Sequence, residues 1–171
     1  MQLVFFLIGA AAGAPNATAP ANPLGRAEQG ELQCYQPDVA QKTCQSIAAY
    51  RRTGPGAYDN KAIVALGDGA TLETRTPVVL KDGAVCGSIS VEDVMAGILT
   101  VGNRVLTPEE AKPILDRIVH GMATMIGKEI CTRYEPSGTD FKAKATIGGV
   151  DQPEDITVKW IKPTDGYTAS R

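Results

Sequence analysis

Aromatic side chains are scarce in this sequence of 171 residues, and it contains a single histidine. Aromatic residues make up 5% of the chain, so the core must be mostly aliphatic. The formal net charge is −2 and Lys and Arg form no cluster, which argues against nucleic-acid binding and against a basic membrane-surface patch. The length suits one domain, and the composition is that of an ordinary globular protein.

Charged residues are missing from the first two dozen positions, because none precedes Arg26. The apolar run 3–8 fades into small residues, which is typical of a secretory signal. The run is shorter than the ~20 apolar residues of a membrane span. We therefore expect a signal peptide over 1–12, a flexible tether over 13–29 and a single domain over 30–171. A buried N-terminal strand is the alternative, because no basic residue precedes the apolar run.

The four cysteines have none of the close spacings of a zinc site or a redox dithiol. They are Cys34, Cys44, Cys86 and Cys131. Export would place them in an oxidising compartment, so we expect a periplasmic or secreted protein with two disulfides. Four cysteines allow three connectivities, and pairing between sequence neighbours, 34 with 44 and 86 with 131, is the simplest.

Two segments carry helix signals. Thr107 and Glu110 form a capping box, and apolar residues at three- and four-residue steps extend the prediction to about Tyr134. Ser90 and Asp93 form a second capping pair that predicts a short helix. The boundary after it is open, because 98–106 also fits a tight hairpin around Gly102-Asn103.

The remaining segments are typical of strands separated by regularly spaced turns. They are 44–51, 61–66, 71–80, 85–89, 141–147 and 156–160. The predicted fold class is α+β, with an antiparallel β meander, one short and one long amphipathic helix, and a C-terminal β-hairpin. We expect the long helix to pack on the apolar face of the sheet, and the bond between Cys86 and Cys131 to join that helix to a strand.

Three short strings carry a family resemblance. They are 37–44 (PDVAQKTC), 83–87 (GAVCG) and 165–167 (DGY). The sequence resembles small exported proteins of Gram-negative bacteria. This resemblance implies a periplasmic or secreted location and carries no known activity, so no site residue follows from it.

The sequence yields no catalytic, cofactor-binding or metal-binding residues. His120 lacks a neighbouring nucleophile or carboxylate arranged as in a triad and is interpreted as a surface residue. The acidic pairs at the predicted helix starts are explained by capping. Arg51 and Arg52, near Tyr50 and Tyr58, are interpreted as a strand-end charge pair, with a small anion-binding spot as the alternative.

Three functional hypotheses follow. The first is a non-enzymatic binding or structural protein that contacts an envelope component or a protein partner. The second is a small hydrolase or lyase whose carboxylates, such as Glu73 and Asp82, converge in a pocket. The third is a secreted enzyme inhibitor that presents the 53–60 loop to its target.

Overall fold

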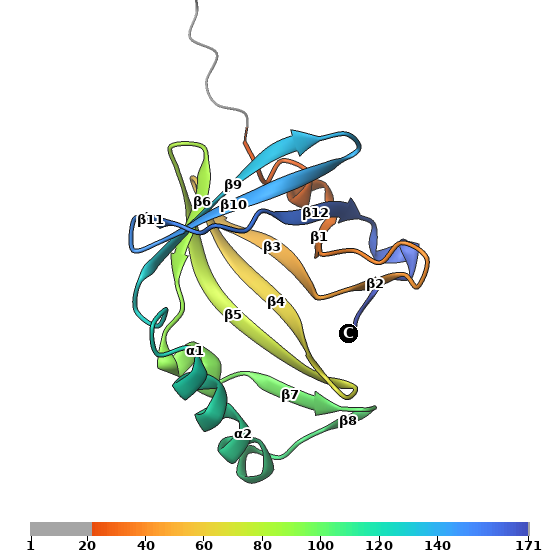
Figure 1. The fold of residues 1–171 in the computed structure, drawn as a ribbon, viewed down its shortest axis with the longest axis vertical. Helices are drawn as coiled ribbons and strands as arrows, with labels where there is room; N and C mark the ends of the chain where they lie inside the picture. The colour runs from red at the N-terminus through yellow and green to blue at the C-terminus, as the bar shows by residue number, and fades with distance from the viewer. Residues whose placement is uncertain (1–21, 171) are drawn as a thin grey trace, which may run out of the picture.

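The computed structural model describes residues 22–170, in which eight antiparallel strands close into a barrel (Figure 1). The strand order is β4-β3-β1-β12-β10-β9-β6-β5, and β5 pairs back with β4 to complete the circle. In chain order these strands are β1 Leu32–Tyr35, β3 Ser46–Gly54, β4 Ala57–Gly67, β5 Ala70–Lys81, β6 Ala84–Ser88, β9 Glu129–Ser137, β10 Asp140–Ile147 and β12 Ile156–Ile161. The expected α+β class is therefore corrected to a mostly-β fold. Closure of the barrel depends on pairings between strands that are distant in the sequence, and the local sequence does not reveal these pairings.

Side chains along each barrel strand alternate between the interior and the outer surface. In β4, Asn60 and Ala62 line the interior cavity, whereas Asp59 and Lys61 form outer-surface ion pairs. The predicted meander is confirmed by the consecutive pairings from β3 to β6, and the predicted C-terminal hairpin by the pairing of β10 with β12. A short strand, β11 (Val150–Asp151), lies in the connection between β10 and β12.

One end of the barrel is closed by the segment that precedes β1. The short 3-10 helix η1 (Ala27–Gln29) begins just after Leu24, which is fully buried. Leu24 belongs to a core cluster with Tyr58, Val85 and Trp160. Leu24 and η1 fall within the expected tether of 13–29. From Asn22 onward, this segment is part of the folded domain. The predicted signal peptide over 1–12 lies outside the described residues.

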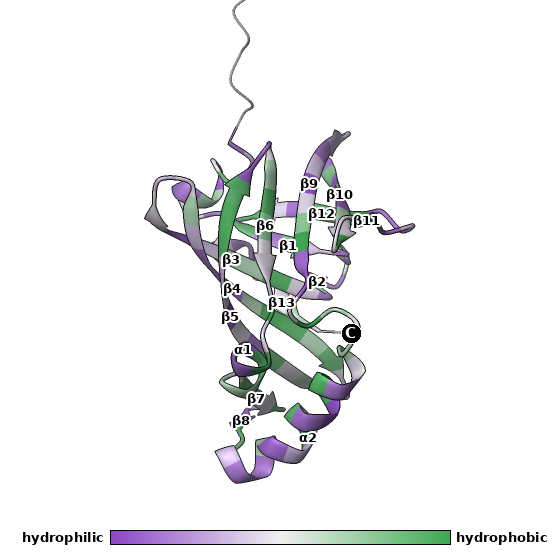
Figure 2. Ribbon diagram, turned by 90° about the vertical axis from the view of Figure 1, so that its left-hand side faces the viewer, coloured by the Kyte–Doolittle hydropathy of each residue, from purple (hydrophilic) through white to green (hydrophobic). Residues whose placement is uncertain are grey.

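The helices cover the other end of the molecule, beside a small extension of the sheet (Figure 1). Both predicted capping boxes are present, at Ser90 for α1 (Val91–Met95) and at Thr107 for α2 (Pro108–Gly121). The hairpin alternative for 98–106 is the one observed, as β7 (Ile98–Val101) and β8 (Arg104–Val105). Hydrophilic and hydrophobic residues alternate along α2 (Figure 2). Its apolar face packs on α1 and on Leu72 of β5 and Leu99 of β7, which are paired with each other. The helix therefore lies where β7 extends the sheet and does not cross the rest of the barrel wall.

The predicted long helix ends thirteen residues early, at Gly121 instead of about Tyr134, and this part of the prediction is wrong. The chain turns at Gly127, which has a φ of 75°, a value that glycine adopts readily. Strand β9 begins two residues later, so Ile130 and Tyr134 belong to the barrel. Ile126 and Ile130 are four residues apart, a spacing that is also typical of one face of a helix, so the sequence predicted that the helix continued.

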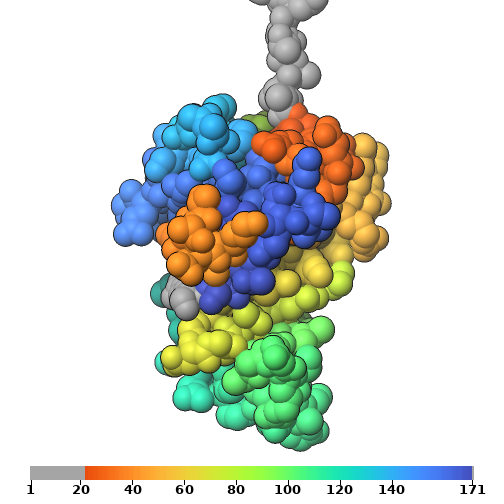
Figure 3. All heavy atoms as spheres, turned by 90° about the vertical axis from the view of Figure 1, so that its right-hand side faces the viewer, coloured from red at the N-terminus to blue at the C-terminus, as the bar shows by residue number. Residues whose placement is uncertain are grey.

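Both predicted disulfides are present, with the predicted pairing. Cys34 of β1 is bonded to Cys44 of β2 (Thr43–Cys44), and β2 pairs with β13 (Thr168–Ala169) after the short helix η2 (Pro163–Asp165). Figure 3 shows this segment near β2 lying against the C-terminal segment on the barrel surface. The second bond joins β6 to β9, and not a helix to a strand as expected.

Among residues 22–170, no helix has both the length and the apolar character that crossing a membrane requires.

Candidate ligand-binding cavity

The barrel interior contains a cavity of about 210 Å³ that is open to solvent. Its walls come from β1, β3, β4, β5, β6 and β9. The lining residues are Tyr35, Tyr50, Asn60, Ala62, Val64, Thr74, Thr76, Val78, Val85, Gly87, Ile89, Ile130, Thr132 and Tyr134. Eight-stranded barrels have interiors that are either filled by side chains or hold one small ligand. In this barrel, small residues such as Ala62 and Gly87 leave the space unfilled.

A hydrogen-bonded cluster of three tyrosines forms one wall of the cavity. The hydroxyls of Tyr35 and Tyr50 each donate to Gln33 Oε1 at 2.9 Å, and that of Tyr134 lies 3.1 Å from the same oxygen. The hydroxyl oxygens of Tyr35 and Tyr134 are 2.7 Å apart. Because a carbonyl oxygen has two lone pairs, one of these two hydroxyls donates to the other. All three hydroxyl protons are thereby engaged.

Burial keeps these tyrosines protonated. Desolvation raises the pKa of Tyr35 and Tyr50 well above the ordinary value of about 10, and neighbouring tyrosines raise it further. Desolvation also raises the pKa of Tyr134. The cluster therefore offers neutral hydroxyls whose remaining lone pairs can accept hydrogen bonds, and it has no group poised to exchange a proton near neutral pH.

The interior also contains buried polar atoms without partners. Among the described residues, the buried side-chain nitrogen and oxygen atoms that lack a hydrogen bond are Gln33 Nε2 and Asn60 Oδ1. Both residues belong to the inner wall. Asn60 is the register partner of Tyr50 on β3 and of Thr76 on β5, so its amide lies within a row of polar side chains.

The rest of the cavity wall combines aliphatic residues with Thr74, Thr76 and Thr132, and it carries no formal charge. No Asp, Glu, His, Lys or Arg side chain is among the described residues that line it. Most lining side chains are only partly buried, so solvent reaches the cavity. Leu24 and Trp160 pack together at the η1 end, whereas Val64, Ile89 and Ile130 line the cavity toward the opposite end.

Gly87 shows how closely this wall is built. A Cβ at this position would lie 2.8 Å from Val78 Cγ1 and 2.9 Å from the Pro77 carbonyl oxygen. Real Cβ atoms essentially never make contacts this short, so a larger residue at position 87 would force Val78 or the backbone of β5 to shift.

A second apolar hollow, of about 490 Å³, lies outside the barrel between α1, α2 and β7. It is lined by Leu99, Leu106, Ala111, Leu115 and their neighbours. Among the residues described, it contains no buried polar atom without a partner. This groove is larger than the barrel cavity, but no polar group in it points to a particular ligand.

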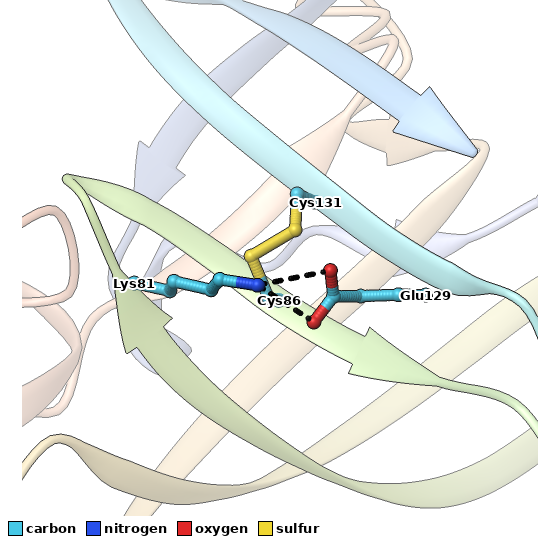
Figure 4. Close-up of a disulfide and its surroundings, with 4 residues drawn as sticks. All are labelled: Lys81, Cys86, Glu129 and Cys131. Atoms are coloured by element: carbon cyan, nitrogen blue, oxygen red, sulfur yellow. Dashed lines mark hydrogen bonds and ion pairs between the residues drawn. A yellow bond between two sulfur atoms is a disulfide. The ribbon is translucent and has the colours of Figure 1, made fainter. Parts of the chain in front are cut away.

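The disulfide between Cys86 and Cys131 lies beside the ion pair of Lys81 and Glu129 (Figure 4), on the side of the wall opposite to the interior-facing Val85 and Gly87. The ligand atoms of Cys86, Glu129 and Cys131 lie within 4.8 Å of one another, which is a separation suited to a metal ion. Both sulfurs are bonded to each other, however, so neither is a thiolate that can bind a metal.

The residues singled out from sequence are not brought together. His120 is exposed in the last turn of α2. Glu73 and Asp82 are nine residues apart along one extended strand and its turn, a span of about 30 Å. Arg51 pairs with Asp59 across β3 and β4 at 3.2 Å, in agreement with the charge-pair interpretation.

The 53–60 segment is a tight hairpin and not a projecting loop. Strand β3 ends at Gly54 and β4 begins at Ala57, and Tyr58 is buried in the core at the closed end. A projecting 53–60 loop would favour the inhibitor, and carboxylates converging in a pocket would favour the hydrolase or lyase. Neither Glu73 with Asp82 nor the 53–60 segment has that arrangement in the described part of the chain.

Sequence reasoning missed Gln33, Asn60 and the three tyrosines of the cavity. The available signal was polar residues at alternate positions of strands, such as Thr74 and Thr76 in β5. Comparison with protein-family models, with curated proteins and with solved structures finds no match to this chain.

Proposed function

We propose that this protein is an exported, non-enzymatic binding protein that holds one small, neutral organic molecule inside its barrel. The observation that carries the proposal is the cavity of about 210 Å³, whose walls combine apolar side chains with a polar cluster and carry no formal charge. A cavity of about 150 Å³ is enough for benzene, so this one suits a single ring with small substituents. An ion would lose its hydration without gaining a charged partner.

The absence of catalytic groups from the cavity supports binding over catalysis. Among the described lining residues, only the tyrosines ionise, and burial raises the pKa of Tyr35, Tyr50 and Tyr134. A neutral hydroxyl of this kind orients a ligand but does not take a proton from it at neutral pH.

Export is supported by the two disulfides, because such bonds persist in oxidising compartments such as the periplasm or the extracellular space. Fractionation of cells that express the full chain tests this part. We expect the protein outside the cytosol with both disulfides formed. Recovery from the cytosol with reduced cysteines would contradict it.

Binding is tested with three neutral single-ring probes, namely benzene, phenol and 2-pyridone, by saturation-transfer NMR. Ala62 lines the cavity from β4, so Ala62→Leu fills part of the space. The matched control is Ala49→Leu on β3, where Ala49 is the register partner of the outward-facing Lys61. We expect at least one probe to bind the wild type and the control, and to bind Ala62→Leu at least tenfold more weakly. Failure of all three probes, or equal binding to Ala62→Leu, would overturn the proposal.

A further inference from the structure

The two disulfides differ in how far solvent reaches their sulfur atoms. Cys34 and Cys44 are both fully buried, whereas Cys131 is partly exposed and its partner Cys86 is 1% exposed. Strand β9 is paired with β6 on one side and with β10 on the other, so the exposed surface of Cys131 belongs mainly to its side chain. A thiol therefore reaches the sulfur of Cys131 in the folded protein, whereas the 34–44 bond is covered.

Cys131 lines a hollow of about 280 Å³ on the side of the wall opposite to the barrel cavity. Both cysteines of the bond line it, together with three cations and two carboxylates, namely Lys81, Arg133, Lys144, Asp82 and Asp151. Lys81 pairs with Glu129, and Lys144 pairs with Glu135. Among residues 22–170, Arg133 forms no ion pair. Because Arg133 follows Cys131 by two positions on β9, the two side chains project from the same face of the strand.

We propose that this hollow is a site of thiol–disulfide exchange with a small thiol that carries a carboxylate. The thiol first loses its proton to water, and its thiolate then attacks Cys131 Sγ. A new sulfur–sulfur bond forms at Cys131, the bond to Cys86 breaks, and its electron pair leaves on Cys86 as a thiolate. Arg133 binds the carboxylate of the incoming thiol through charge-assisted hydrogen bonds. Attack by the Cys86 thiolate on Cys131 Sγ reverses the step and releases the thiol.

The ion pair beside the bond bears on the leaving sulfur. A carboxylate oxygen of Glu129 lies within 4.8 Å of both sulfur atoms, and its negative charge opposes a thiolate. The ammonium group of Lys81, 3.3 Å from Glu129 Oε2, offsets that charge, and the two side chains point toward one another beside the bond (Figure 4). The hollow and the barrel cavity lie on opposite sides of the wall, so the exchange does not require a ligand in the barrel.

The first test uses the wild-type protein, so it does not depend on the folding of any variant. The protein reacts with excess 3-mercaptopropionate, the reaction is quenched with acid, and peptide mapping by mass spectrometry locates free thiols and thiol adducts. We expect the adduct on Cys131 and a free thiol at Cys86 while the 34–44 bond is still intact. An adduct on Cys86, equal or faster loss of the 34–44 bond, or no reaction at either bond would overturn the proposal.

The second test concerns the carboxylate and compares 3-mercaptopropionate with 2-mercaptoethanol, which carries no charge. Arg133→Gln removes the cation, and the matched control is Arg117→Gln on α2, at another exposed arginine without an ion pair in the described part of the chain. We expect Arg133→Gln to slow the reaction of 3-mercaptopropionate about threefold more than that of 2-mercaptoethanol, which is the size of an exposed ion pair. The control should change neither rate. Equal effects of Arg133→Gln on the two thiols would overturn the assignment of a carboxylate-bearing thiol.

Discussion

Removal of each disulfide separately should destabilise the barrel by different amounts. The two variants are the double substitutions Cys86→Ala with Cys131→Ala, and Cys34→Ala with Cys44→Ala. Cys86 and Cys131 are direct register partners in the β6–β9 ladder, so the backbone hydrogen bonds of that ladder hold the native geometry without the bond. The principal effect of the substitutions is therefore on the unfolded chain, which gains freedom when the cross-link is lost.

The expected magnitudes follow from the lengths of the closed loops. The bond from Cys86 to Cys131 spans 45 residues and the bond from Cys34 to Cys44 spans 10. In the chain-entropy model these loops correspond to about 4 kcal/mol and about 2.7 kcal/mol of unfolding free energy. With a urea dependence of about 2 kcal/mol/M, the unfolding midpoints should fall by about 2 M and about 1.3 M.

The assay is urea unfolding followed by the fluorescence of Trp160, the only tryptophan of the chain. Trp160 is 8% exposed and packs at the closed end of the barrel, where the Arg26 guanidinium lies 5.7 Å from the ring centroid. Unfolding transfers this ring to water and changes its emission. Equal shifts for the two variants, or a larger shift for the variant that lacks the 34–44 bond, would refute the loop-length reasoning.

Three further predictions concern the tyrosine cluster, the closed end and a helix cap. Burial raises the folded-state pKa of Tyr35 and Tyr50, so the unfolded chain loses these protons first as the pH rises past about 10. The free energy of unfolding should therefore fall above that pH. Absorbance of the phenolates in the near ultraviolet should show that they form only as the circular dichroism of the fold is lost. Leu24→Ala should cost about 3 kcal/mol in urea unfolding, because Leu24 is fully buried, whereas Leu66→Ala, at a residue 37% exposed, should cost much less. Thr107→Ala should cost about 1 kcal/mol, because it removes the hydroxyl that accepts from Glu110 N; an unchanged midpoint would contradict the role of this cap.

Features that depend on nearby residues were predictable from the sequence. The capping boxes at Ser90 and Thr107 involve residues three positions apart, and both form as expected. The disulfide pairing also followed from sequence order.

Features that depend on distant pairings were not predictable in the same way. The end of the long helix was misplaced because Ile126 and Ile130 fit both a helical stripe and the start of a strand. The alternation of Ile130, Thr132 and Tyr134, which all line the cavity, is the pattern of a strand with one inward face. Only the pairing of β9 with β6 and β10 decides between the two.

The cavity escaped prediction for the same reason. Tyr35 and Tyr134 are separated by 99 positions, yet their hydroxyls are hydrogen-bonded. No local sequence motif predicts this contact. The pairing of β4 with β5 closes the barrel, and this closure determines which face of each strand is interior.

The most direct test of the account is methyl NMR of the wild-type protein titrated with 2-pyridone. We expect shifts at methyl groups that line the barrel cavity, such as those of Ala62, Val85 and Ile130. Methyl groups of the outer groove, such as those of Ala111 and Leu115, should not move. Shifts confined to the outer groove, with an unchanged barrel interior, would contradict the claim that the barrel is the binding site.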